Sequence, residues 1–187
     1  MIVLIGASAS GKTELAKILC NSYGFKKCIT TTTRLIRENE RNNIDYHFIS
    51  KETFKIMDDN DEFIGVTNYH ENLYGIQKND LVLNGVLIVD PSGANSLIDT
   101  MKQELFVVFI ESSEKLRRLR MIKRGDTTEI IKKRLASDNL LFQPKHIKRI
   151  DLLIKNEDDS LTSLAELIYN EYTNHLNLKK VERDIKF

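Results

Sequence analysis

A chain of 187 residues is long enough for one well-packed core and too short for two domains of ordinary size. Its 28 Lys and Arg residues offset 27 Asp and Glu residues, and the net charge of +1 argues against a general nucleic-acid-binding or anionic membrane surface. Two cysteines, and apolar runs well short of the ~20 residues of a spanning helix, predict a cytoplasmic protein without disulfides or membrane segments.

Residues 6–13 read Gly-Ala-Ser-Ala-Ser-Gly-Lys-Thr and match the P-loop pattern G-x-x-x-x-G-K-[ST] at every fixed position. An apolar run over 1–5 predicts a strand before the motif, and apolar residues at helical spacing predict a helix over 14–23. The chemistry predicts ATP and Mg²⁺ here: backbone N–H groups contact phosphates, Lys12 reaches the β and γ phosphates, and the Thr13 hydroxyl ligates the metal. The expected nucleotide-binding residues are Ala7, Ser8, Ala9, Ser10, Gly11, Lys12 and Thr13.

A strand is predicted over 26–33, and the polar segment after it carries Arg34 and Arg37 three residues apart, with Tyr46 further on. Guanidinium groups bind phosphate bidentately and a phenol adds a neutral donor, so these side chains could converge on one phosphate. A solvated polar loop is the alternative, and the spacing alone leaves it open. Short elements follow: a helix over 50–57 with Ser50 as its N-cap, a strand over 62–67, and a turn with another short element over 72–76. This irregular region predicts a small inserted lobe over residues 31–85.

Regular alternation then resumes, with strands predicted over 85–90, 105–110 and 151–156 and helices over 92–101, 113–122 and 161–172. The first of these strands ends at Asp90, which either holds the Mg²⁺ hydration shell or only caps the next helix. Basic residues around Gly125 predict a hinged, phosphate-facing lid over about 120–134, with a solvated helix face as the alternative. The pattern fades over 177–187, which we expect to form an extension. Strands that alternate with helices after a P-loop predict a three-layer α/β fold with a parallel sheet, its core formed by 1–30 and 86–176.

The order of these segments resembles that of guanylate kinases up to about residue 172. The resemblance is carried by the P-loop and by the motifs Thr32-Thr33-Arg34-x-x-Arg37-x-x-Glu40, Asp45-Tyr46-x-Phe48-Ile49-Ser50, Glu62-Phe63-Ile64, Asn72-Leu73-Tyr74-Gly75, Asp90-x-x-Gly93, Arg124-Gly125, Arg134-Leu135 and Asn156. It implies transfer of the γ-phosphoryl group of ATP to a nucleoside monophosphate, GMP or dGMP in the first place.

The resemblance also implies roles for single residues. The acceptor 5′-phosphate would contact Arg34, Arg37, Tyr46 and Tyr74, with Glu40 beside them, and Thr30 and Asp90 would also line the acceptor site. The charge on the transferring group would be neutralised by Arg120, Arg124 and Arg134, and Asn156 would lie near the adenine. These arginines would meet one reacting centre only if lobe and lid swing inward.

Two positions depart from the family pattern at the guanine-reading site. Gly65 replaces a glutamate, Ile76 replaces a serine or threonine, and Thr30 keeps the expected hydroxyl. These departures leave room for a kinase with altered or relaxed acceptor specificity. A third reading, a non-catalytic binding module, is disfavoured because Lys12, Thr13, Asp90 and the arginine set are all present.

Overall fold

The computed structural model describes residues 1–38, 40–157 and 160–184. Within these residues the main sheet has five strands in the order β2 (Lys26–Lys27), β7 (Gly85–Val89), β1 (Ile2–Ile5), β8 (Phe106–Glu111) and β9 (Leu152–Lys155). Every neighbouring pair is parallel. Since parallel strands need long crossovers, the intervening helices cover the faces of this sheet.

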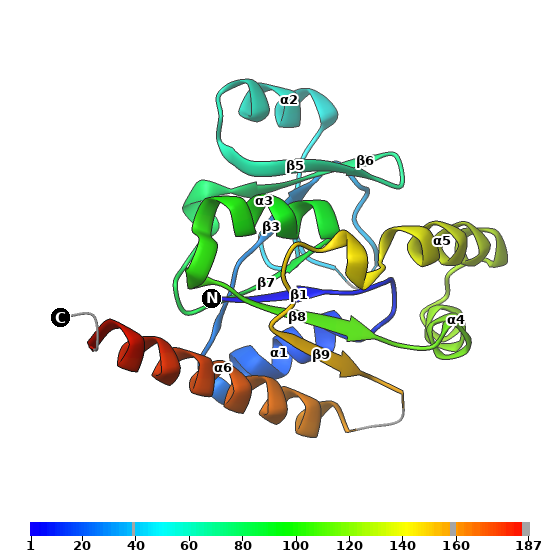
Figure 1. The fold of residues 1–187 in the computed structure, drawn as a ribbon. Helices are drawn as coiled ribbons and strands as arrows, with labels where there is room; N and C mark the ends of the chain where they lie inside the picture. The colour runs from blue at the N-terminus through cyan, green and yellow to red at the C-terminus, as the bar shows by residue number, and fades with distance from the viewer. Residues whose placement is uncertain (39, 158–159, 185–187) are drawn as a thin grey trace.

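Strand β1 shows how the core is divided into two halves. Ile2 and Leu4 pack with buried residues of α1 (Lys12–Tyr23) and α6 (Leu161–Asp184), whereas Val3 and Ile5 pack with α3 (Pro91–Met101) on the opposite face. This alternation follows from the two-residue period of a strand. Figure 1 shows α3 on one side of the sheet and α1 and α6 on the other. The expectation of a three-layer α/β fold is thereby confirmed.

A second sheet forms above α3 in the order β4 (His47–Phe48), β3 (Thr30–Thr32), β6 (Asn72–Gln77) and β5 (Phe63–Tyr69). Helix α2 (Lys51–Asp59) packs on it through Phe54, whose ring stacks on Phe63 at 4.6 Å between centroids. A separate sheet over 30–77 supports the proposed lobe of 31–85. The single strand expected over 26–33 is wrong, because residues 26–27 pair with β7 while residues 30–32 pair with β6 in the second sheet.

Two helices, α4 (Glu114–Lys123) and α5 (Thr128–Leu141), lie beyond the carboxyl end of β8. They pack through the buried side chains of Met121, Ile131 and Leu135, against which Ala9 of the P-loop also packs. Gly125 adopts a φ of 88° directly after α4, a left-handed conformation that glycine accepts at little cost. Three short 3₁₀ turns complete the regular structure of the described residues: η1 (Lys78–Asp80), η2 (Lys102–Glu104) and η3 (Pro144–His146).

Helix α6 is longer than the sequence pattern predicts. Its buried positions end at Tyr172, which is 8% exposed, whereas Leu178 is 66% exposed. The helix nevertheless continues to residue 184, so the expected end of the helix at 172 is wrong. Residues 177–184 of the predicted extension are helical, and residues 185–187 lie outside the described part. The helix thus extends beyond the end of its apolar face, and the apolar periodicity is the signal on which the prediction depends. In the described part of the chain, no helix has both the length and the apolar character needed to cross a membrane.

Candidate active site

The P-loop connects β1 to α1 at the carboxyl end of the main sheet. Gly11 has a φ of 103°, and a Cβ added there would lie 2.3 Å from Nδ2 of Asn156, so the position requires glycine. Asn156 is 1% exposed and its Nδ2 donates to the Ser10 carbonyl at 2.8 Å. This amide therefore supports the loop from behind, a contact that the sequence did not predict, while its contact with adenine stays a prediction.

Lys12 reaches back over the loop. Its Nζ donates to the carbonyls of Gly6 at 2.6 Å and Ala7 at 2.8 Å. Burial lowers the pKa of Lys12 to about 8, although nearby Asp138 acts in the opposite direction. The ammonium group is thus held at the loop by neutral carbonyl oxygens. Phosphate oxygens are charged and therefore stronger hydrogen-bond acceptors for the same group.

One cavity lies between the P-loop, the second sheet and the pair α4 and α5. The predicted site residues that line it are Ser8, Ala9, Lys12, Thr13, Thr30, Arg34, Arg37, Tyr46, Tyr74, Asp90, Arg124 and Arg134. Residues from five separate stretches of the chain therefore face the same space. The structure brings together both halves of the predicted site, the loop that would hold ATP and the loop that would hold the acceptor phosphate.

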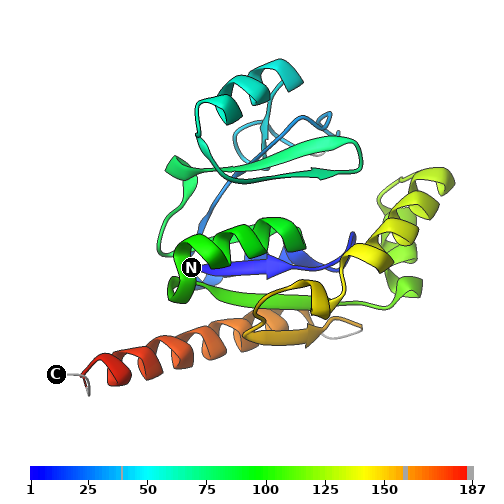
Figure 2. The same cartoon turned by 45° about the horizontal axis from the view of Figure 1, so that its top comes forward.

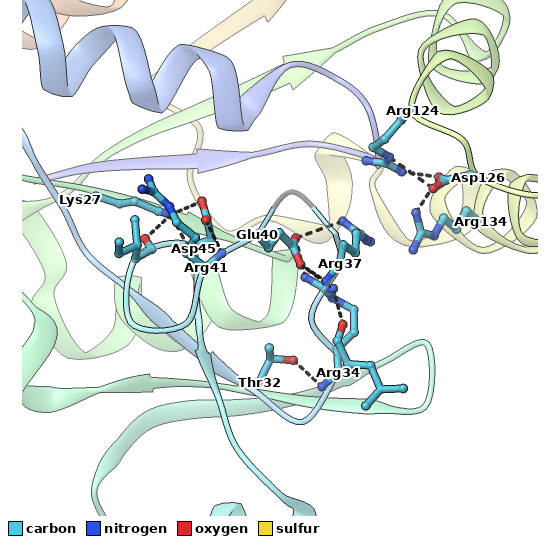
Figure 3. Close-up of polar contacts among 12 residues, drawn as sticks. Lys27, Thr32, Arg34, Arg37, Glu40, Arg41, Asp45, Arg124, Asp126 and Arg134 are labelled. Atoms are coloured by element: carbon cyan, nitrogen blue, oxygen red, sulfur yellow. Dashed lines mark hydrogen bonds and ion pairs between the residues drawn. The ribbon is translucent and has the colours of Figure 1, made fainter.

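On the acceptor side, Glu40 joins two of the predicted phosphate ligands. Arg34 donates to both Glu40 carboxylate oxygens, at 2.9 and 2.8 Å, and Arg37 donates to one of them at 3.4 Å (Figure 3). Arg34 also lies over the ring of Tyr46, 5.3 Å from its centroid. Burial would raise the pKa of Glu40, but the hydrogen bonds from Arg34 and the Arg37 backbone outweigh it and leave this pKa lowered. A guanidinium fork receives carboxylate and phosphate in the same geometry, so binding of the acceptor phosphate by Arg34 and Arg37 stays a prediction that these contacts are compatible with.

The lid side contributes two more guanidinium groups, which share one carboxylate. Arg124 and Arg134 both donate to Asp126, the latter at 2.9 Å, and Figure 3 shows this group facing Arg37. Burial and the charges of Arg34, Arg134 and Arg124 lower the pKa of Arg37, which shows how closely the cations gather. In this structure Arg34, Arg37, Arg124 and Arg134 line one cavity, and the inward swing of lobe and lid onto one reacting centre stays a prediction.

Arg120 points to the back of the P-loop. Its guanidinium donates to the Ala9 carbonyl at 3.3 Å, to Oγ of Ser112 at 2.8 Å and to Oδ1 of Asn156 at 3.2 Å. These contacts tie α4 to the loop and to the end of β9. A direct role for Arg120 in neutralising the transferring group stays a prediction.

Asp90 caps α3, the helix that follows it, and a helix cap is one of the two predictions for this residue. Oδ1 accepts from the Gly93 backbone at 2.9 Å and Oδ2 accepts from the Thr67 hydroxyl at 2.5 Å. Asp90 and Thr13 line the same cavity. The described residues hold no cluster of three or more His, Cys, Asp or Glu side chains suited to a metal. Mg²⁺ at phosphates usually takes only one or two protein oxygens, with phosphate and water as its other ligands, so Thr13 and Asp90 fit this ion.

The two positions that depart from the family pattern also line the cavity. Gly65 has a φ of 83°, and a Cβ there would lie 2.7 Å from Cβ of Ser96. A longer side chain at this position would therefore need the backbone or α3 to shift. Ile76 is 2% exposed and pairs with Thr30, whose hydroxyl donates to the Ile88 carbonyl at 3.4 Å.

Sequence reasoning missed a buried polar group beside the P-loop. Asp138 of α5 is 0% exposed and accepts hydrogen bonds from the Ser8 backbone and from Tyr69. The signal was present in the helix pattern, because Asp138 shares a face with the buried Ile131 and Leu135. A carboxylate on the apolar face of a helix indicates a buried, partnered acid.

A P-loop at the carboxyl end of a parallel sheet, with arginines from separate segments across one cavity, defines a P-loop kinase. Solved structures that share the fold include a guanylate kinase from Anaplasma phagocytophilum (TM-score 0.70, 24% identity, 93% of this chain and 84% of that chain covered) and a shikimate kinase from Acinetobacter baumannii (TM-score 0.51, 14% identity, 92% of each chain covered).

Sequence comparison shows to which family of P-loop kinases the chain belongs. The family model for guanylate kinase matches residues 1–171, and the chain belongs to that family. Curated relatives include the guanylate kinases of Anaplasma phagocytophilum (strain HZ), 32% identical over 168 residues, and of Campylobacter jejuni (strain RM1221), 34% identical over 170 residues. The alignments cover 84% of this chain in both cases, and 79% and 81% of the relatives.

Proposed function

We propose that this chain transfers the γ-phosphoryl group of ATP to a nucleoside monophosphate, with GMP or dGMP as the acceptor. One observation carries the proposal: Lys12 of the P-loop and the arginines of lobe and lid, Arg34, Arg37, Arg124 and Arg134, line a single cavity. Such a concentration of cations can neutralise the phosphates of ATP and the phosphate of an acceptor that lies in line with them. In this scheme residues 31–85 form the acceptor lobe and residues 120–134 the lid.

The residues of the chain then act by positioning and by charge. Arg34 and Arg37 leave Glu40 partly or wholly and hold the acceptor phosphate, while Tyr46 and Tyr74 add neutral donors. Lys12 stabilises the charge that develops on the β and γ oxygens, and Arg124 and Arg134 neutralise the transferring group. The attacking oxygen is already anionic, so no general base is required. Mg²⁺, held by Thr13 and through water by Asp90, would supply further charge neutralisation at the ATP phosphates.

The comparisons support GMP as the acceptor, because the curated relatives are guanylate kinases. They do not favour an altered acceptor base or a non-catalytic module. Since Gly65 and Ile76 bring no polar side chain to the cavity, we propose that Thr30, with its buried hydroxyl, contributes to reading the guanine edge. We also propose a cytoplasmic location, consistent with the free thiols of Cys20 and Cys28.

A coupled assay of ADP release, with ATP, Mg²⁺ and each common ribo- and deoxynucleoside monophosphate in turn, tests this function. We expect GMP and dGMP to be phosphorylated most efficiently. Lys12→Ala should lower the rate by about two to four orders of magnitude in a folded protein. Lys17→Ala is the matched control, because Lys17 is an exposed residue of α1 paired with Glu14. Equal turnover of Lys12→Ala and wild type, or a clear preference for another monophosphate, would contradict the proposal.

A further inference from the structure

Three segments that are far apart in the sequence meet at the carboxylate of Asp138. Asp138 of α5 accepts from the Ser8 backbone N–H at 2.7 Å through Oδ2, and its Oδ1 accepts a short hydrogen bond from the Tyr69 hydroxyl. Ser8 belongs to the P-loop, and Tyr69 ends β5 in the second sheet. Oγ of Ser8 lies 3.2 Å from the Tyr69 hydroxyl, which closes a small ring of polar groups.

Asp138 is held in its charged form although it is fully buried. Burial would raise the pKa of its carboxyl group, but the nearby His70, whose Nε2 lies 3.8 Å from Oδ1, and the hydrogen bonds from Tyr69 and Ser8 outweigh that effect and leave the pKa lowered. Arg117 adds a guanidinium nitrogen 3.4 Å from Oδ2. A buried carboxylate with this many donors is costly to leave unpaired, so its partners are held strongly.

The hairpin that delivers Tyr69 has a strained tip. His70 and Glu71, the two residues between β5 and β6, have φ values of 51° and 64°. Left-handed conformations at two residues other than glycine cost free energy, and such strain is kept where other contacts over-determine it. The Tyr69 ring contacts Phe142 at 6.0 Å and Tyr74 at 6.1 Å between centroids. Figures 1 and 2 both show the tip of the β5–β6 hairpin extending toward α5.

The same helix face also carries a residue of the proposed reaction. Arg134 lies four residues before Asp138 in α5, one turn away, and lines the cavity. Fixing Asp138 against the P-loop therefore fixes the base of the Arg134 side chain as well. Tyr74, a predicted ligand of the acceptor phosphate, lies next to Tyr69 on the neighbouring strand.

We propose that Asp138 is a positioning residue that fastens the acceptor lobe to the P-loop through the Tyr69 hydroxyl. The contact sets the distance between the acceptor-phosphate ligands of the lobe and the ATP-binding loop, and it orients Arg134 toward the space between them. This inference rests on the proposed phosphoryl transfer for its kinetic consequences. Its structural consequence, a lobe held to α5 and the P-loop, is independent of the reaction.

Tyr69→Phe is the sharpest test, because it removes the hydroxyl and keeps the ring that packs on Phe142. A hydrogen bond to a buried charge is strong enough that we expect the KM for the monophosphate to rise about tenfold. The kcat should change less than about threefold, since saturating acceptor restores the lobe position seen in this structure, and the Kd of ATP alone should stay within about twofold. Tyr23→Phe is the matched control, because Tyr23 stacks on Tyr169 between α1 and α6, away from the cavity.

A second variant and a readout other than activity complete the experiment. Asp138→Asn should raise both the KM for the acceptor and the Kd of ATP, because it removes the charge that Ser8 and Tyr69 share. When the changes in acceptor KM are expressed as free energies, the change in the double variant should be smaller than the sum of the changes in the two single variants. Hydrogen exchange followed by mass spectrometry, on the proteins without nucleotide, should show faster exchange of the hairpin 66–73 in Tyr69→Phe and unchanged exchange in Tyr23→Phe.

The outcomes separate the two proposals. If the wild-type protein phosphorylates no monophosphate, the proposed function fails, and the hairpin exchange alone decides the role of Tyr69 and Asp138. If the wild type is active but Tyr69→Phe matches it in acceptor KM and in hairpin exchange, Asp138 does not position the lobe and this inference is overturned.

Discussion

The lowered pKa of Lys12 leads to a measurable coupling between ATP binding and pH. Burial places this pKa at about 8, so roughly 90% of the side chain is charged at pH 7 and only roughly 10% at pH 9. Bound ATP phosphates favour the charged form and raise its pKa. The affinity for ATP should therefore fall about tenfold between pH 8 and about pH 9.3 as the free protein loses the proton, a change of about 1.4 kcal/mol.

Isothermal titration calorimetry at constant Mg²⁺ from pH 7.5 to 9.5 measures this effect, and buffers of different ionisation enthalpy report proton uptake. We expect an uptake of about 0.5 proton per ATP at pH 8 and close to one at pH 9. Lys12→Arg is the control, since its guanidinium stays charged over this range and should bind ATP with little dependence on pH. A Kd that is constant from pH 7.5 to 9.5 in a protein that stays folded would show that Lys12 is not desolvated as the structure indicates.

Two further predictions use matched pairs of residues. Arg34→Lys should raise the KM for the monophosphate about ten- to hundredfold, because lysine cannot donate two parallel hydrogen bonds, whereas Arg41→Lys in the same loop should leave the KM within about twofold in the steady-state assay. Gly65→Ala should lower the free energy of unfolding in urea by at least about 1 kcal/mol more than Gly24→Ala. Both glycines have positive φ, at 83° and 71°, but an added Cβ meets Ser96 only at Gly65 and open space at Gly24, so equal losses would refute the steric argument.

Much of the helix and strand order follows from local patterns. The boundaries of β7, β8 and α2 fall within about two residues of the expected ones, because uninterrupted apolar runs and the Ser50 cap are strong local signals. The pairing of strands does not follow from local patterns, because it depends on which strand edge a segment meets in the folded protein. The chain from 26 to 32 divides between two sheets although its sequence reads as one strand.

The sequence by itself determined the nucleotide-binding loop, because G-x-x-x-x-G-K-[ST] encodes a backbone geometry and a charge within eight adjacent residues. It also predicts which arginines would bind phosphates. Only the tertiary structure decided that Arg120 and Asn156 support that loop from behind, and that Asp138 joins it to Tyr69. Such contacts form between residues more than 60 positions apart, where packing of whole helices and strands sets the pairing. The helix pattern indicates that Asp138 is buried, but the local sequence does not name its partners.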